Sequence, residues 1–230
     1  YSLNGTKAFV SGGGYSDAYV AMVRTSDDGA AGVSTVYVED GTEGLSFGGL
    51  EDKMGWRSQP TSQVQFDNCN IPAGNLVGEE GKGFKYAMMG LDGGRLNIAA
   101  CSLGAAQTAL TSTLHYMGDR KAFGKSINQF QGLQWRLADM EIALQSARTF
   151  LRHAAWALDT GQPDATKRCA MAKKLCTETG SQVADQCLQL HGGYGYMNEY
   201  PIARMFRDAR VQRIYGGTNE IMKVLIARSL

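Results

Sequence analysis

The sequence predicts an α+β protein, with an antiparallel β-domain over residues 1–78 and an antiparallel four-helix bundle over residues 79–230. Residues 1 to about 75 hold short segments rich in β-branched and aromatic side chains, separated by clusters of Gly, Asp and Ser. From Lys82 onward, apolar residues recur at steps of three and four, which is the spacing of amphipathic helices. The segment Ile-Pro-Ala-Gly at residues 71–74 marks the change between the two patterns.

Four segments of the first part are expected to be strands: residues 7–11, 18–23, 33–38 and 62–66. Three consecutive glycines at residues 12–14 and Asp-Asp-Gly at residues 27–29 separate the first three of them. These residue types favour tight turns, so they support antiparallel pairing of the strands.

The second part carries three stripes with helical spacing. The longest alternates steps of four and three, as in a helix packed nearly parallel to its neighbours: Leu133, Leu137, Met140, Leu144, Ala147, Leu151, Ala154 and Leu158. A stripe of small residues suits close helix packing: Ala172, Cys176, Thr179, Val183 and Cys187. The third stripe comprises Phe84, Met88, Leu91, Ile98, Ala105 and Ala109. Gly-Gln-Pro-Asp at residues 161–164 is expected to end one helix and start the next. With short C-terminal helices, one of them over residues 220–230, these stripes predict a four-helix bundle.

Composition argues against several classes of protein. The chain has 23 Lys and Arg residues against 22 Asp and Glu residues, which offers no bulk charge for nucleic acid or an anionic membrane. It contains no apolar run long enough to predict a membrane span. The five cysteines form no CxxC pair, and Cys176 and Cys187 lie in a helical pattern of small residues. We therefore expect buried free thiols rather than disulfides or a zinc site, which favours a reducing compartment.

Two glycine-rich segments near the C-terminus, residues 191–196 and 215–218, flank a basic segment at residues 204–210. Glycine lets the main chain approach a flat or anionic ligand that a Cβ atom would exclude. Thr218 and Asn219 stand where an N-cap would begin the last helix, so free N–H groups would face the second glycine segment. Ordinary helix ends and turns explain the same pattern.

Two further places carry charged residues that could bind a ligand. Arg95 falls on the apolar stripe between Leu91 and Ile98, and Asp92 precedes it by three residues, so either an internal ion pair or a ligand contact is expected. In the segment 119–125, the planar guanidinium of Arg120 suits a pyrophosphate, although a solvated basic loop would look the same.

Other polar residues are assigned no chemistry. His115, His153 and His191 are scattered without the spacing of a metal site. Lys121, Lys173 and Lys174 are interpreted as charges on solvated faces.

Five blocks, in order, resemble the acyl-CoA dehydrogenases, which are flavoenzymes that oxidise acyl-CoA thioesters. They are SLNGTKAFVSGGGYSDAYV, GWRSQPTSQVQFDNCNIP, GLDGGRLNIAACSLGAAQ, DRKAFGKSINQFQ and a C-terminal signature of HGGYGY, RMFRDARV and RIYGGTNEIMK. The third block is most similar to members that use short branched substrates such as isobutyryl-CoA. The resemblance covers the whole chain and implies the middle β-domain and the C-terminal helical domain of this family. Family members carry a helical N-terminal domain and an initial β-segment ahead of the position of Tyr1, so the chain is expected to be a fragment.

The resemblance implies FAD as cofactor, with these contact residues: Phe9, Ser11, Arg120, Phe123, Gln131, Gln189, Gly193, Thr218 and Glu220. Arg120, Phe123 and Gln131 would bind the FAD of a neighbouring subunit, and Gln189 and Gly193 would contribute to the same adenosine-diphosphate site. Phe9 and Ser11 would lie on the strand beside the isoalloxazine ring. An alternating strand with Phe9 in the core fits the sequence equally.

For the acyl-CoA thioester, the resemblance implies contacts from Leu91, Asp92, Arg95, Tyr215, Gly216 and Arg228. It also implies a homo-oligomer (dimer or tetramer), an electron-transfer flavoprotein as partner, and a location in the bacterial cytoplasm or the mitochondrial matrix. Neither nucleic acid nor a membrane is expected as a partner.

One feature departs from the family pattern. Most members place a catalytic Glu directly before Gly-Thr or Gly-Ser in the C-terminal loop, where this chain has Gly216. A minority place it on the first bundle helix, where this chain has Gly94. The chain is a variant without the base, or the base comes from a segment outside the chain, or the chemistry differs. The resemblance therefore implies either dehydrogenation of a short or branched acyl-CoA, or a flavoprotein that binds the thioester without dehydrogenating it, such as a desulfinase-like member. Asp92 is the nearest remaining carboxylate in the sequence.

Overall fold

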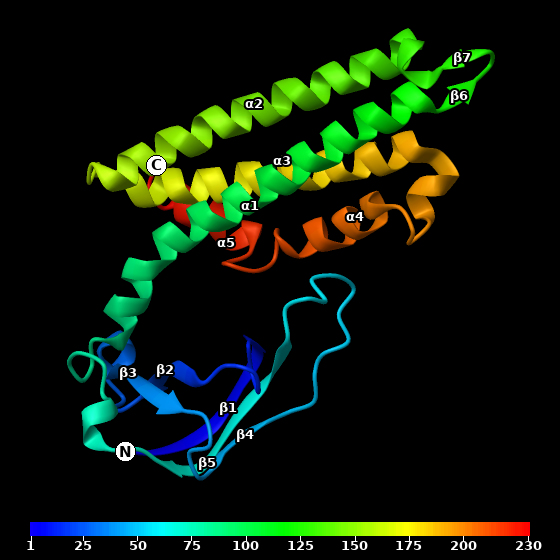
Figure 1. Cartoon of the computed structure of the whole chain (residues 1–230). Helices are drawn as coiled ribbons and strands as arrows, with labels where there is room; N and C mark the ends of the chain where they lie inside the picture. The colour runs from blue at the N-terminus through cyan, green and yellow to red at the C-terminus, as the bar shows by residue number, and fades with distance from the viewer. The chain divides into compact units, whose positions relative to one another are not determined.

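The computed structural model describes residues 1–230, which divide into two compact units, residues 1–90 and 91–230. Figure 1 shows the strands β1 to β5 in the first unit and the long helices in the second. The helix α1 (Gly83–Asp119) begins in the first unit and continues through the second. None of the helices has the length and apolar character needed to cross a membrane.

The first unit holds two small antiparallel sheets. One has the order β1-β5-β4, with β1 at Ser2–Ser11, β5 at Thr61–Asn70 and β4 at Leu45–Phe47. The other pairs β2 (Ala18–Arg24) with β3 (Val33–Glu39). Short 3-10 turns lie at Gly29–Gly32 and Ala73–Asn75.

All four expected strand segments lie within observed strands, and their pairing is antiparallel. The glycines at residues 12–14 do not form a hairpin between β1 and β2, because β1 pairs with the distant β5. Gly12 and Gly14 adopt φ angles of +78° and +77°, and the amide of Gly12 donates to Pro60 O at 2.9 Å. Positive φ angles favour glycine, so this turn directs the chain out of one sheet into the other. Strand β4 was not expected, because three residues are too few for a recognisable pattern.

The second unit is built on three long helices. α1 is followed by a hairpin of β6 (Lys121–Ala122) and β7 (Lys125–Ser126), the 3-10 turn Ile127–Gln129, α2 (Gln131–Asp159) and α3 (Ala165–His191). The 3-10 segment Gly192–Tyr196 leads to α4 (Pro201–Val211), and the chain ends with α5 (Asn219–Ala227). In Figure 1, α2 runs antiparallel to α3, and α4 and α5 lie along α3. Residues 161–164 separate α2 from α3 as expected, whereas α5 is shorter than the predicted 220–230 helix.

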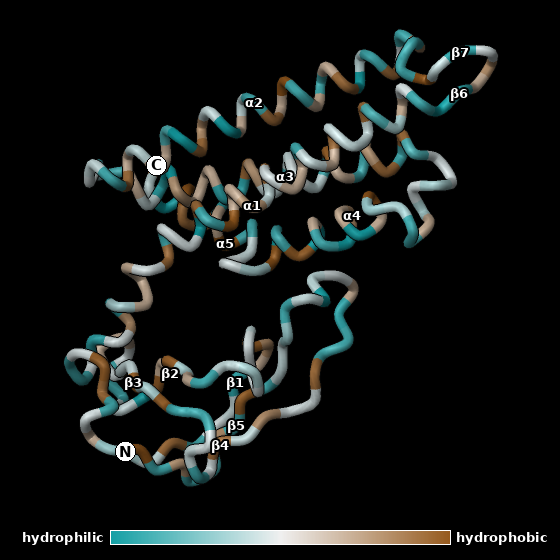
Figure 2. The backbone as a smooth tube through the Cα atoms, viewed as in Figure 1, coloured by the Kyte–Doolittle hydropathy of each residue, from teal (hydrophilic) through white to brown (hydrophobic).

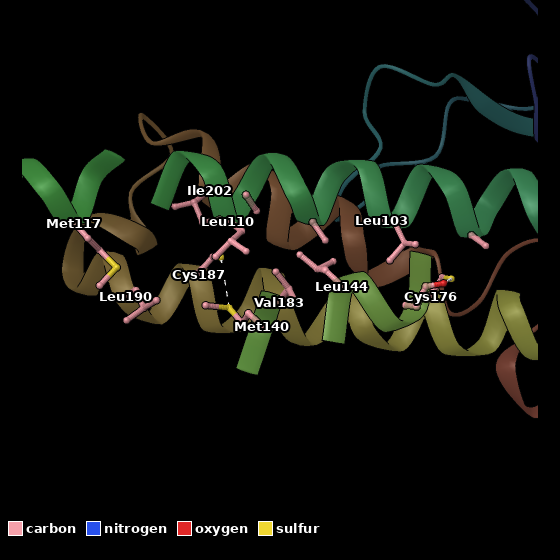
Figure 3. Packing of buried hydrophobic residues seen from close by; sticks show 14 residues of the cluster. Leu103, Leu110, Met117, Met140, Leu144, Cys176, Val183, Cys187, Leu190 and Ile202 are labelled. Carbon is pink, nitrogen blue, oxygen red and sulfur yellow. Dashed lines mark hydrogen bonds between the residues drawn. The ribbon is translucent and has the colours of Figure 1, made fainter. Parts of the chain in front are cut away.

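The core of this unit joins α1, α2 and α3, as Figure 3 shows for Leu103, Leu144 and Val183. The predicted stripe on α2 is confirmed, since its members are buried or half-buried, and Figure 2 shows hydrophobic and hydrophilic positions alternating along this helix. The small-residue stripe on α3 is fully buried. Ser102 Oγ donates to Cys176 O at 3.1 Å, and a Cβ atom at Gly180 would collide with that hydroxyl. Small residues therefore allow α1 and α3 to pack closely.

The third predicted stripe is confirmed only in part, because Ala109 is buried and Leu91 is half-buried. Phe84 and Met88 are exposed, and Ile98 and Ala105 are only half-buried. The buried face of α1 is made of Ala99, Leu103, Ala106, Ala109, Leu110 and Met117, of which only Ala109 belongs to the predicted stripe. Apolar and small residues lie around the whole circumference of α1, so periodicity alone did not identify the face that packs.

The free thiols of Cys176 and Cys187 are buried, as predicted, and so are those of Cys69 and Cys169, whereas Cys101 is exposed. Burial disfavours the thiolate and raises the pKa of Cys176 to about 12 and that of Cys169 to about 11. Because the folded pKa lies above the unfolded value of about 8.5, these thiols stabilise the fold below that pH. Their contribution is lost as the pH rises.

We expect Cys176→Ala to lessen the alkaline loss of stability. For one thiol that stays protonated in the folded state, the loss between pH 8 and pH 10 is roughly 2 kcal/mol. Urea unfolding at both pH values measures the free energy of unfolding for the wild type and the variant. Cys101→Ala, on the exposed thiol, is the matched control and should lose as much stability as the wild type. Equal losses in the wild type and Cys176→Ala would contradict this role of burial.

Candidate functional site

The C-terminal glycine segment forms a tight loop at the start of α5. Gly216 and Gly217 adopt φ angles of +64° and +88°, and the amide of Asn219 donates to Arg213 O at 3.1 Å across the loop. Thr218 is the N-cap of α5, as predicted, because its Oγ1 accepts from the amide of Ile221 at 3.3 Å. Both glycines therefore have conformations that other residues rarely adopt.

Gly216 faces the helix α1. A Cβ atom at Gly216 would lie 3.1 Å from Cγ1 of Ile98. Gly94 precedes Ile98 by four residues, so the two lie one helical turn apart on the same face of α1. A Cβ atom at Gly94 would have no heavy atom within 4 Å apart from its own helix backbone. The structure thus brings the two candidate positions for a catalytic carboxylate to the same stretch of α1, with more space at Gly94.

Asp92 and Arg95 form an internal ion pair beside this stretch. Arg95 is 7% exposed, and its Nη1 lies 2.5 Å from Asp92 Oδ1. The second carboxylate oxygen of Asp92 accepts from Thr166 Oγ1 of α3 at 2.5 Å. The ion-pair interpretation is confirmed, and Asp92 is poorly placed as a free base because both of its oxygens already have partners.

The other predicted thioester residues are spread more widely. Leu91 and Tyr215 are half-buried, on α1 and in the C-terminal loop. Arg228 is exposed and caps the far end of α5, about 13 Å along the helix axis from Asn219. Of these residues, Tyr215 adjoins Gly216 in the loop, and Leu91 precedes Ile98 on α1 by seven residues.

A pocket of about 500 Å³ opens at the opposite end of the long helices, where α1 ends and α3 meets the first glycine segment. It gathers three predicted FAD residues, Arg120, Gln189 and Gly193. Gly192 and Gly193 line the pocket with main chain alone. Gly192 has a φ angle of +60°, and a Cβ atom at Gly193 would have no neighbour within 4 Å. An arginine beside an open stretch of glycine backbone can bind a pyrophosphate.

Aromatic side chains form the wall of this pocket. The rings of Tyr116 and His191 stack with centroids 4.3 Å apart, and Tyr116 donates to His191 O at 3.1 Å. The guanidinium of Arg120 lies 5.5 Å from the ring centroid of Tyr194. Sequence reasoning did not assign Tyr116 or His191, although an aromatic residue one turn before Arg120 was a signal that could have been used.

The hairpin β6–β7 presents Phe123 to solvent. This residue is 96% exposed and has a φ angle of +50°, which is rare for an aromatic residue. Gln131, at the start of α2, is exposed as well. Neither residue lines the pocket that contains Arg120.

In the first unit, Phe9 does not belong to the core, so the alternative of an ordinary alternating strand is wrong. Phe9 is 75% exposed with a φ angle of +55°, and the register of β1 against β5 shifts between Lys7 and Val10. An irregularity of this kind redirects side chains. Ser11, two residues on, is exposed at the end of β1.

The interpretation of Lys173 as a solvated charge is also wrong. Its side chain is 0% exposed, whereas Lys121 is exposed and Lys174 pairs with Glu178 at 2.7 Å. Lys173 follows Cys169 by four residues and precedes Cys176 by three, so it lies on the small-residue face of α3. That spacing was the available signal for burial.

Comparison with known proteins identifies the family. Residues 81–230 match the family model for the acyl-CoA dehydrogenase C-terminal domain, and residues 1–69 match that for the acyl-CoA dehydrogenase middle domain. The chain belongs to the acyl-CoA dehydrogenase family. Its two units therefore represent the middle β-domain and the helical C-terminal domain of this family.

Relatives in the acyl-CoA dehydrogenase family match along the whole chain. Mitochondrial isobutyryl-CoA dehydrogenase of Bos taurus is 49% identical over 230 residues, which are 100% of this chain and 55% of the relative. The structure of butyryl-CoA dehydrogenase from Megasphaera elsdenii has a TM-score of 0.95 at 41% identity and covers 100% of this chain and 60% of its own. An FAD complex of PigA has a TM-score of 0.94 at 33% identity, with coverage of 100% and 60%. The chain thus spans little more than half the length of these relatives.

Proposed function

We propose that the full-length protein is an FAD-dependent acyl-CoA dehydrogenase that introduces an α,β double bond into a short or short branched acyl-CoA. The observation that carries this proposal is the pocket that places Arg120 beside the bare glycine backbone of residues 192–193 and near Gln189. Family membership and the names of the relatives, isobutyryl-CoA and butyryl-CoA dehydrogenase, support the substrate class.

The residues present fit the adenosine-diphosphate part of FAD. Arg120 would bind the pyrophosphate, Gly193 would allow it to approach the main chain, and the polar side chain of Gln189 would contribute hydrogen bonds. When bound, the flavin supplies a ring that accepts a hydride from the substrate. We propose flavin contacts also for Phe9 and Ser11, beside a flavin ring, and for Thr218 and Glu220 at the start of α5.

The exposed residues Phe123 and Gln131 support a homo-oligomer, as a dimer or tetramer. The positive φ angle of Phe123 is unfavourable for a non-glycine residue by about 1–3 kcal/mol, and such conformations cluster at sites that meet a ligand. We propose that Phe123, Gln131 and Arg120 contact FAD bound to a neighbouring subunit. Electrons would pass to an electron-transfer flavoprotein.

The thioester would lie along the stretch of α1 that faces the C-terminal loop, with contacts from Leu91, Tyr215 and the main chain of Gly216. Asp92 and Arg95 would border this site as a preformed pair. Removal of the α-proton needs a base, and both positions discussed above are glycine. This absence favours a second candidate, a flavoprotein of the same family that binds the acyl-CoA thioester without dehydrogenating it.

Flavin absorbance separates the two candidates. The full-length protein, purified with its FAD, is mixed anaerobically with isobutyryl-CoA, and the absorbance band of oxidised flavin at about 450 nm is recorded. Bleaching is expected for a dehydrogenase. Unchanged colour with saturable thioester binding would favour the second candidate, and a full-length oligomer that holds no flavin would contradict both.

A further inference from the structure

The buried amine of Lys173 on α3 contacts the C-terminal glycine loop. Its Nζ donates to Gly217 O at 2.7 Å and to Asn219 Oδ1 at 3.0 Å. Lys173 belongs to α3, whereas its two acceptors lie 44 and 46 residues later, on either side of the N-cap of α5. One side chain thus links the middle of α3 to the end of the loop and to the first residue of α5.

A polar network extends this link. Asn219 Nδ2 donates to Thr177 Oγ1 at 3.1 Å and lies 3.4 Å from Glu178 Oε1. Thr177 follows Lys173 by one helical turn, and its hydroxyl donates to Lys173 O at 2.8 Å. Lys173, Thr177 and Asn219 are all at most 2% exposed, so water competes little for these bonds.

The position of an ammonium group here calls for an explanation. A charge without exposure is unfavourable unless it is compensated, and Lys173 has no carboxylate within ion-pair distance. Burial lowers the pKa of Lys173 to about 8, and the negative charge of Glu220 on α5 opposes that shift. The compensation comes chiefly from two oxygen atoms of the loop, one of them a main-chain carbonyl. An apolar side chain at residue 173 would leave that carbonyl without its donor.

We infer that Lys173 is a positioning residue that holds the loop 215–218 in the conformation that meets the thioester. This inference rests on the proposed function for the role of the loop, but the anchoring itself is a property of this chain. Gly216 and Gly217 have little conformational preference of their own, because glycine backbone is the most permissive. A bond to the carbonyl between Gly217 and Thr218 therefore restrains the most flexible part of the loop.

Hydrogen exchange of the full-length protein tests the anchoring directly. In Lys173→Met, amides of residues 213–222 should exchange about 10–100-fold faster, because a charge-assisted bond to the loop is lost. The rest of α3 should keep its protection. Lys167→Met is the matched control, since Lys167 is another lysine of α3 whose Nζ reaches a main-chain carbonyl, Ser229 O at 3.4 Å, outside the loop.

A second readout addresses positioning rather than stability. At saturating isobutyryl-CoA, the flavin of Lys173→Met should be reduced about 10–100-fold more slowly, because a displacement of the loop by about 1 Å lowers the reaction rate by a factor of this order. Flavin content and melting temperature should be unchanged. A merely structural lysine would instead change the melting temperature without changing the rate of the folded fraction. A lower rate of flavin reduction accompanied by lower flavin content or a lower melting temperature would overturn the role of Lys173 as a positioning residue.

Equal exchange in Lys173→Met and Lys167→Met would overturn the anchoring. Should Lys173→Met fail to fold, Asn219→Ala removes one acceptor, and unchanged exchange in residues 213–222 of that variant would overturn it as well. If the wild type holds no flavin, the proposed function fails while the exchange experiment still decides the role of Lys173.

Discussion

Gly94→Glu is expected to raise acyl-CoA-dependent flavin reduction by about 10²–10⁴-fold, the usual contribution of a positioned general base. Residue 94 lies one turn from Ile98, the residue that Gly216 faces, and a Cβ atom there has no neighbour within 4 Å. A helix also tolerates Glu better than Gly by roughly 0.5–1 kcal/mol, so the change should not cost stability. Partial burial by the bound thioester would raise the pKa of the new carboxyl toward the working pH.

Gly216→Glu should gain less, although most family members have their carboxylate there. At a φ angle of +64° a side chain costs roughly 1–2 kcal/mol, and Ile98 would have to move to relieve a contact of 3.1 Å. The loop would therefore be distorted as the base is introduced. Comparing the two variants separates the need for a base from the need for this loop conformation.

Single-turnover stopped-flow absorbance with isobutyryl-CoA measures the rate in the full-length protein, with flavin content determined alongside. Gly94→Gln is the matched control, because it has nearly the same shape and no carboxylate. If Gly94→Glu binds flavin and thioester but is no faster than Gly94→Gln, the missing base is not what limits the reaction. A wild type that already reduces its flavin rapidly would show that another residue takes the proton.

Arg120→Ala is expected to weaken FAD binding about 10–100-fold, because it removes charge-assisted hydrogen bonds from the guanidinium to phosphate oxygens. Arg120 lines the pocket at the end of α1, within 5.5 Å of the ring of Tyr194 and beside the open backbone of Gly193. Arg120→Lys should recover only part of the affinity, because an ammonium group cannot donate in the bidentate geometry of arginine.

Flavin retained after gel filtration, followed by titration of the apoprotein with FAD, gives the loss in each variant. Lys121→Ala is the control, since it removes a positive charge from the adjacent residue, which is exposed and does not line the pocket. Equal losses in Arg120→Ala and Lys121→Ala would indicate a general charge effect. Full flavin content in Arg120→Ala would contradict the assignment of the pocket.

The α+β architecture was predictable because most helices and strands bury one face, which spaces the apolar residues periodically in the sequence. The stripe from Leu133 to Leu158 is buried or half-buried, and the small residues of α3 are buried, as expected. Motifs also placed Arg120, Gln189 and Gly193 in one site, and the structure gathers them in one pocket. These are features that short spacings or family patterns record directly.

Pairings between distant residues were not predictable, because no local pattern records them. The partner of β1 is β5, some 60 residues away, and the packed face of α1 depends on which neighbours meet a helix that is apolar nearly all round. The position of Lys173 on the small-residue face of α3 was a signal for burial, but its partners Gly217 and Asn219, more than 40 residues later, were seen only in the folded chain. In the same way, the strain that a side chain at residue 216 would meet arises from its φ angle and from Ile98, more than 100 residues earlier, and only the folded chain brings these together.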